Sequence, residues 1–281
     1  MMDRRELLFG LGVSAAGFAA LPAFGRAALD LGDRADFLTA CVKMRGSLDD
    51  RLSLGWVNGK RYAVVDHEAI PMMGMLAATL TRYRRVSAEA FAVRSLEIAY
   101  FTDFDSGELI ETWKNPVTGV VVDVPRTRMG PSSLTVTADG LEVQMPVGEA
   151  RGLKLNHRFE PAVVRGDDVW INEVIGVNGK GRPGQQPFVY NEMTTYQAQM
   201  SDLADPDQPT VPTNVSFHGL VTYRPWMGFG DTPGHTTAHG AGTRASRIED
   251  LPGYWLELTE RFHPDVLDDP LGALDTEAGE A

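Results

Sequence analysis

The chain has 281 residues, 43% of them hydrophobic, a formal net charge of −12 and a single cysteine. The acidic balance opposes binding to the phosphate backbone of nucleic acids, and one cysteine excludes an intrachain disulfide, a cysteine-rich zinc site and an iron–sulfur cluster. The sequence also contains no nucleophile elbow and no glycine-rich nucleotide loop after a predicted strand. We therefore expect a folded protein that uses no nucleotide or other cofactor.

The N-terminus has the pattern of an export signal. Arg4 and Arg5 precede an apolar run from Leu7 to Gly25 that is rich in glycine and alanine. This pattern predicts a twin-arginine signal peptide over residues 1–27, cleaved near Gly25 to Ala27, with the twin-arginine translocase as partner and the periplasm as destination. The alternative is an uncleaved membrane anchor, but the run is only weakly hydrophobic. We expect no stable membrane span in the mature protein.

The next segment predicts one short helix followed by many strands. Residues 33–45 can form a helix with Asp33 as its cap. In residues 52–65, Asn58 and Gly59 stand between two apolar runs, which predicts a hairpin turn. Residues 91–124 read as three strands joined at 105–107 and 115–119, and Asp139-Gly140 predicts another hairpin. Further alternating segments occupy residues 167–181, 188–199 and 213–223.

So many strands separated by turn residues predict a mainly β fold. An antiparallel sheet of this size protects its edges by closing into a barrel or by forming a sandwich. We expect an antiparallel barrel of the lipocalin or calycin type, which can hold one small ligand, with the short N-terminal helix. The domain is expected to cover residues 33–263 as a single unit. Residues 264–281 are acidic and predict a solvated, mobile tail.

Two groups of motifs resemble a known family. The first is Tyr-Phe-Thr-Asp at 100–103, followed by Gly-Glu-Leu at 107–109 and Thr-Trp-Lys-Asn-Pro-Val-Thr-Gly at 112–119. The second is Arg-Pro-Trp-Met-Gly-Phe-Gly-Asp at 224–231, with His239 after it. Together they resemble domain-of-unknown-function family 1838 (DUF1838) over roughly residues 36–262. The resemblance implies an exported bacterial protein with a largely β architecture, and it implies no mechanism. His235 and Ala238 depart from the family pattern.

His235 and His239 stand four residues apart in a stretch rich in glycine and threonine. On a helix the two imidazoles would lie about 6 Å apart and could share a metal ion, whereas on a strand their α-carbons would be about 13 Å apart. The surrounding glycines and threonines favour the strand, so we expect no metal site. Both side chains then point to one side, either into the barrel, where imidazole suits proton transfer, or into solvent.

A second polar face lies in residues 188–199. Tyr190, Glu192, Thr194 and Tyr196 alternate with their neighbours, so they share one side of a strand. Inside a dry barrel, burial would make Glu192 a candidate acid or base between two phenols; on the outer face it would be a solvated carboxylate. His218 is expected either to join the same cavity or to be a structural histidine.

Arg224 and Trp226 flank a predicted turn. The arginine could hold a ligand carboxylate through two hydrogen bonds while the indole forms a stacking wall. In the alternative, the pair closes one end of the barrel and the arginine pairs with Asp231. We count Arg224, Trp226, Asp231 and His235 as candidate ligand contacts.

Two functions are compatible with this pattern. The first is a small-molecule-binding barrel that acts as a cofactor-independent lyase or isomerase on an apolar or aromatic substrate. In it, His239 or His218 is the base, Glu192 is its partner or the acid, and Tyr190 and Tyr196 stabilise a developing oxyanion. The second is a non-catalytic, lipocalin-like carrier or sensor of a hydrophobic ligand. The sequence leaves open whether the protein forms a homo-oligomer.

Overall fold

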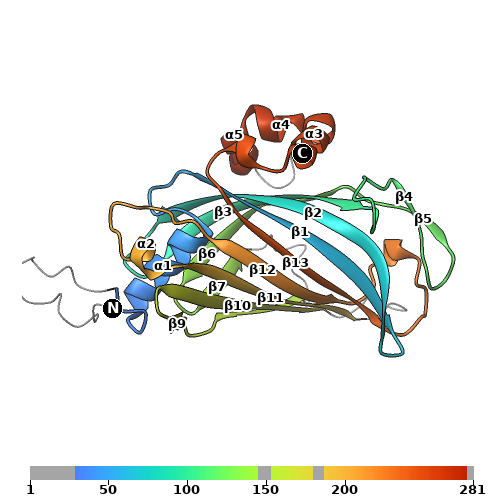
Figure 1. The fold of residues 1–281 in the computed structure, drawn as a ribbon, viewed down its shortest axis with the longest axis horizontal. Helices are drawn as coiled ribbons and strands as arrows, with labels where there is room; N and C mark the ends of the chain where they lie inside the picture. The colour runs from blue at the N-terminus through green and yellow to red at the C-terminus, as the bar shows by residue number, and fades with distance from the viewer. Residues whose placement is uncertain (1–28, 145–152, 180–186, 277–281) are drawn as a thin grey trace, which may run out of the picture.

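A computed structural model describes residues 29–144, 153–179 and 187–276 of the chain. Its main feature is an antiparallel sheet of eleven strands that curls almost into a closed barrel (Figure 1). The strands follow the order β7-β6-β3-β2-β1-β13-β12-β11-β10-β8, with β9 paired to β10. They are β1 (Leu52–Val65), β2 (Glu68–Arg85), β3 (Phe91–Thr102), β6 (Thr127–Thr137), β7 (Gly140–Gln144), β8 (Leu153–Phe159), β9 (Val163–Arg165), β10 (Asp168–Gly179), β11 (Phe188–Gln199), β12 (Asn214–Val221) and β13 (His235–Ala245). The predicted fold class, a mainly β antiparallel barrel, is confirmed.

Short elements complete the two ends and one side. They are α1 (Arg34–Arg45), α2 (Met200–Leu203), η1 (Pro225–Met227), η2 (Ile248–Asp250), α3 (Gly253–Phe262), α4 (Pro264–Asp268), α5 (Pro270–Asp275) and the small sheet of β4 (Thr112–Lys114) with β5 (Val121–Asp123). β4, β5 and η1 lie at the end of the barrel opposite α1 (Figure 1). No helix within the described ranges is long and apolar enough to cross a bilayer. The predicted signal peptide lies outside the described residues.

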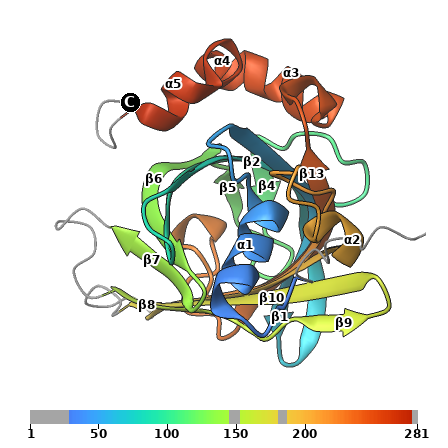
Figure 2. The same ribbon diagram turned by 90° about the vertical axis from the view of Figure 1, so that its left-hand side faces the viewer.

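Helix α1 lies across one mouth of the barrel (Figure 2). The side chain of Asp33 accepts hydrogen bonds from the backbone N–H groups of Ala35 and Asp36, which satisfies two donors at the helix start. Phe37, Leu38 and Cys41 are buried and pack into the core at this end of the barrel. The helix therefore closes this mouth, and Arg45 in its last turn is carried to the inside.

The predicted hairpin at Asn58-Gly59 is wrong. β1 runs straight through both residues, and the chain turns instead at Asp66 and His67, which have φ angles of 49° and 69°. Two adjacent residues with positive φ form the tight turn that suits a hairpin. Gly59 is needed for another reason: a β-carbon there would lie 2.6 Å from the carbonyl oxygen of His239 on the neighbouring strand. The hairpin predicted at Asp139-Gly140, between β6 and β7, is confirmed.

The prediction of a mobile tail is wrong for residues 264–276. Helices α3, α4 and α5 lie over the outer face of the sheet (Figures 1 and 2) and bury Trp255, Val266 and Leu274 completely. The apolar outer faces of β1, β2 and β3 form the other half of this second core. Burial of these apolar side chains outweighs the repulsion among the acidic groups of the segment.

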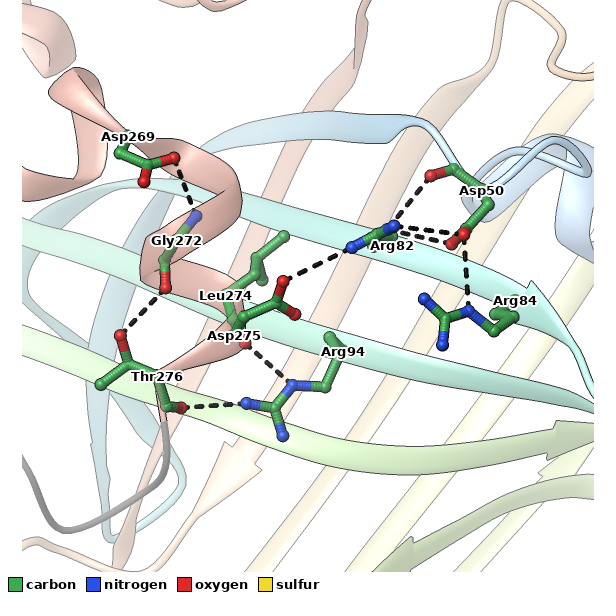
Figure 3. Close-up of polar contacts among 9 residues, drawn as sticks. All are labelled: Asp50, Arg82, Arg84, Arg94, Asp269, Gly272, Leu274, Asp275 and Thr276. Carbon is green, nitrogen blue, oxygen red and sulfur yellow. Dashed lines mark hydrogen bonds and ion pairs between the residues drawn. The ribbon is translucent and has the colours of Figure 1, made fainter.

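Arginines on the sheet fix the last helix in place (Figure 3). The Arg94 guanidinium on β3 donates to the carbonyl oxygens of Leu274 at 2.8 Å and Thr276 at 2.9 Å. Arg82 on β2 forms an ion pair with Asp275 at 3.5 Å. These contacts satisfy carbonyl groups at the C-terminal end of α5, where a cation is favoured.

Candidate functional site inside the barrel

The barrel encloses a cavity of about 150 Å³ next to α1. Alternating side chains of the strands line it, because successive residues of a strand point to opposite faces. The apolar lining residues are Trp56, Val57, Ala77, Val93, Leu134, Leu141 and Val215. The polar ones are Arg45, Arg244, Tyr83, Tyr196, Thr79, Thr81 and Ser95. A cavity that combines apolar walls with several polar groups is typical of a small-molecule site.

A buried ionic network stands at the α1 end of this cavity. The Glu173 carboxylate on β10 is 1% exposed, and its Oε1 lies 3.0 Å from Nη2 of Arg45 and 2.5 Å from Nε2 of His157. The hydroxyl of Tyr196 donates to the other oxygen, Oε2, at 2.9 Å. Burial opposes ionisation of this carboxyl, but the Arg45 guanidinium and the two hydrogen bonds outweigh it and hold its pKa below the usual value. Glu173 is therefore an ionised carboxylate with partners at both of its oxygens.

Arg244 on β13 is the second guanidinium at the cavity. It donates through Nη1 to the backbone carbonyl of Arg45, and its Nε is buried with no hydrogen-bond partner in the described part of the chain. Burial lowers the pKa of Arg244 to about 10, and the neighbouring Arg45 lowers it further while two tyrosines oppose the shift. The group still carries its charge at neutral pH.

Farther along the interior lie two carboxyl groups. Glu192 on β11 accepts hydrogen bonds from the hydroxyls of Tyr190 and of Thr194, the latter at 3.0 Å. Glu97 on β3 has Thr79, a cavity-lining residue, as its direct partner on β2. Burial raises the pKa of Glu97 to about 7, and the carboxylate of Glu192 adds to the shift. Burial likewise raises the pKa of Glu192, against the hydrogen bonds that it accepts.

One arginine lies near these two carboxyl groups without a direct ion pair. Arg61 on β1 contacts the sulfur of Met75 at 3.8 Å and the ring face of Phe101, with 5.6 Å from its guanidinium carbon to the ring centroid. Its charge opposes the upward pKa shifts of both Glu97 and Glu192. Burial in turn lowers the pKa of Arg61. At this end of the interior, the charge of one arginine thus partly compensates those of two carboxyl groups.

The structure does not bring the predicted catalytic residues together. His218 on β12 and His239 on β13 are exposed on the outer face, paired with one another at 6.3 Å between ring centroids. His218 also pairs with Met193, which is 51% exposed, whereas Glu192 at the next position points inward. The expected grouping of His218, His239 and Glu192 in one chamber is therefore wrong, because the sheet wall separates the imidazoles from the carboxyl group.

The histidines of β13 point into solvent, the second of the two predicted orientations, and glycines occupy the inner face of this strand. Gly240 and Gly242 alternate with the polar residues of this strand, and the aromatic ring of Phe217 on β12 fills the space over Gly240. The ring of His239 stacks instead on Tyr62 at 5.7 Å on the outside. His235 lies on the same outer side and is partly exposed.

The other predicted ligand contacts are divided between the interior and the far end. Tyr190 and Tyr196 face inward with Glu192, as expected for a shared side of β11. Arg224 is partly buried beside η1, with its guanidinium over the ring of Phe188 at 4.6 Å. Trp226 packs against Phe101 at 5.5 Å in the cluster that closes this end. Asp231 is exposed.

Several interior charged residues escaped the sequence analysis. They are Arg45, Arg61, Glu97, His157, Glu173 and Arg244. One signal was available for the two glutamates. Each is the single charged residue on a mostly apolar alternating face, Glu97 between Val93 and Phe101, and Glu173 between Val169 and Val177. A charge at such a position is buried and needs a partner.

Over residues 29–144, 153–179 and 187–276, no three side chains of histidine, cysteine, aspartate or glutamate gather closely enough to hold a metal ion. Cys41 is a free thiol on the buried face of α1, and burial raises its pKa well above the usual range. It is thus poorly suited to act as a nucleophile.

Comparison with known proteins gives a family and no named activity. The family model for the proteins of unknown function DUF1838 matches residues 50–144 and 183–277, about two thirds of the chain. The matched segments include Glu97, Glu192 and Arg244, whereas α1 and strands β8 to β10 lie outside them. A comparison with curated proteins finds no match. The chain therefore belongs to the DUF1838 family, as the motifs at residues 100–119 and 224–239 led us to expect.

Proposed function

We propose that this protein binds a small, largely apolar organic molecule inside the barrel, in the manner of a lipocalin-like carrier or sensor. The cavity beside α1 carries this proposal, because apolar side chains and several polar groups line it together. A cavity of about 150 Å³ has room for a molecule of the size of benzene with a short substituent. The ligand class is therefore a single-ring or short-chain compound.

Binding in the cavity can be tested by filling it. Ala77 lines the cavity and is 3% exposed, so Ala77→Leu places three additional carbon atoms in the ligand space. We expect this variant to lose affinity for single-ring compounds by about tenfold or more, measured by calorimetry with a panel of benzene and cyclohexane derivatives. Ala241→Leu on the exposed face of β13 is the control and should bind as the native protein does. Equal affinity of both variants would contradict the proposal.

A second function, acid–base catalysis, is favoured by one specific observation. The pKa of Glu97, raised to about 7 by burial and by Glu192, gives a carboxyl group that can both donate and accept a proton near neutral pH. The hydroxyl of Tyr190 donates a hydrogen bond to the second carboxyl group, that of Glu192. In this candidate function the barrel isomerises its ligand, or eliminates a group from it, without a cofactor. The carboxyl pair takes the role that the sequence analysis gave to histidine.

Catalysis and simple binding differ in their response to Glu97→Gln. A lyase or isomerase would lose most of its turnover in this variant while keeping its ligand affinity, and its rate would depend on a group with a pKa near 7. A carrier would show no product from any ligand that binds. His239→Ala is the control for both functions, since its imidazole lies outside the barrel. The measurement is product analysis by chromatography after incubation with each bound compound.

We also propose that the mature protein acts in the periplasm. The support is the Arg4-Arg5 pair with its apolar run. Replacement of both arginines by lysine should leave the protein in the cytoplasm, which cell fractionation would detect. Periplasmic protein in the double variant would argue against the twin-arginine route.

A further inference from the structure

We propose that the α1 end of the cavity is a carboxylate-binding site centred on Arg244, so that the ligand of the barrel is a small organic monoacid. This inference rests on the proposed function, because it names the class of molecule that the cavity binds. It follows from the charges around the cavity, from the free donors on two arginines and from the shape of the apolar wall.

The charges around the cavity do not balance. Two guanidinium groups, those of Arg45 and Arg244, line it, and no carboxylate is among the described lining residues. Glu173 is the acidic group beside them, and both of its oxygens are already bound by Arg45, His157 and Tyr196. One positive charge is thus left over in a buried position. A buried charge without a counterion is unfavourable, and a bound anion would remove this cost.

Among the described residues, each of the two arginines also keeps one unpaired donor. Nε of Arg244 and Nη1 of Arg45 are both buried and have no hydrogen-bond partner within the described ranges. They come from neighbouring groups, since Arg244 also donates to the Arg45 carbonyl. A guanidinium offers its N–H groups in a planar fork that matches the two oxygens of a carboxylate.

Small neighbouring residues leave room for such a ligand. Gly55 on β1 stands directly opposite Arg244, and a β-carbon at Gly55 would come within 3.9 Å of the Arg244 side chain. The hydroxyl-bearing residues Tyr83, Thr81 and Ser95 lie around the same end of the cavity. The apolar side chains of Val57 and Val215 form the wall against which the rest of the ligand would pack. The site therefore suits an acid group on a compact apolar body.

The test compares acids with their neutral amides. Benzoate, cyclohexanecarboxylate and hexanoate are titrated into the full mature protein beside benzamide, cyclohexanecarboxamide and hexanamide, which have nearly the same shape. We expect at least one acid to bind about tenfold to 100-fold more tightly than its amide, the range typical of charge-assisted hydrogen bonds. The ¹⁵N resonance of Arg244 Nε should shift on binding of the acid and stay unchanged with the amide.

Arg244→Met removes the charge and keeps a long apolar side chain, and it also removes the hydrogen bond to the Arg45 carbonyl. In this variant the acid should bind no better than its amide. Arg247→Met is the control, since Arg247 lies on the surface with its side chain 66% exposed, and it should leave the preference for acids unchanged. If Arg244→Met fails to fold, Arg244→Gln replaces it and should likewise bind the acid no better than its amide. The shift of the Arg244 Nε resonance in the native protein is then the second measurement.

The two proposals fail in different ways. Equal binding of acid and amide by the native protein would overturn the carboxylate site and leave the cavity function intact. A preference for acids that survives Arg244→Met would also overturn it. Absence of binding by every acid and amide would overturn the proposed cavity function and the carboxylate site together.

Discussion

The backbone N–H of Leu141 donates to Nδ1 of His157 across 2.8 Å, and this bond joins β7 to β8 at the two ends of the sheet. It also fixes the tautomer of the imidazole. Because Nδ1 accepts, the proton is on Nε2, which donates to Oε1 of Glu173. One histidine therefore both links the last strands of the barrel and orients the carboxylate that binds Arg45.

Replacement of His157 should weaken the whole barrel. His157→Leu leaves the Leu141 N–H unpaired and removes one partner of the buried Glu173 carboxylate, so we expect the free energy of unfolding to fall by about 2–3 kcal/mol. His218→Leu is the matched control on the exposed face of β12 and should change it by less than about 0.5 kcal/mol. Urea denaturation followed by tryptophan fluorescence measures both. Equal effects would show that the link at His157 contributes nothing.

The carboxyl group of Glu97 should make stability depend on pH. Its pKa is raised from 4.5 to about 7 in the folded protein, so between these values the folded state holds a proton that the unfolded chain releases. The free energy of unfolding therefore falls as the pH rises through this window, by roughly 3 kcal/mol from this group. Glu97→Gln should remove the decrease.

The comparison is made by urea denaturation at pH 5 and pH 8. The free energy of unfolding of Glu97→Gln minus that of the native protein should be larger at pH 8 than at pH 5. Glu257→Gln, on the exposed face of α3, is the control and should follow the native pH dependence. A Glu97→Gln variant that kept the native pH dependence would show that this carboxyl group ionises normally.

The C-terminal helices should contribute to the stability of the barrel. Leu274 is fully buried between α5 and the sheet, whereas Leu271 in the same helix is 41% exposed. We expect Leu274→Ala to reduce the free energy of unfolding by about 3 kcal/mol and Leu271→Ala to reduce it by about 0.5 kcal/mol or less. Hydrogen exchange of β2 and β3 should increase in the first variant only. Similar exchange in both would mean that α5 does not protect the sheet.

Two glycines on neighbouring strands should respond oppositely to a methyl group. A β-carbon at Gly240 would lie 2.5 Å from the ring of Phe217 and 2.7 Å from the carbonyl oxygen of Asn58. At Gly219 the nearest atom, the β-carbon of Ala238, would be 4.0 Å away. Gly240→Ala should therefore cost about 2 kcal/mol or more, while Gly219→Ala should be neutral or slightly stabilising. Thermal unfolding of the two variants tests this, and a neutral Gly240→Ala would contradict the close packing of β1 against β13.

The sequence by itself determined the mainly β fold class and, within a strand, which side chains share a face. The alternation in residues 188–199 correctly grouped Tyr190, Glu192 and Tyr196, because the period of two follows from the geometry of a single strand. The Asp139-Gly140 turn and the β-rich fold class followed from equally local rules. The local signal failed at Asn58-Gly59, where a contact with β13 rather than a turn requires the glycine.

Only the tertiary structure decided which face of each strand is inside. His239 and Arg244 are five residues apart on β13, so they point to opposite sides, and both sides of this strand contain polar and small residues. Alternation defines two faces but gives no reason to bury one of them. Closure of the sheet and the position of α1 made that choice. They brought Arg244, Arg45 and Glu173 together from three distant segments, because the energy of a buried charge depends on neighbours that are remote in the chain.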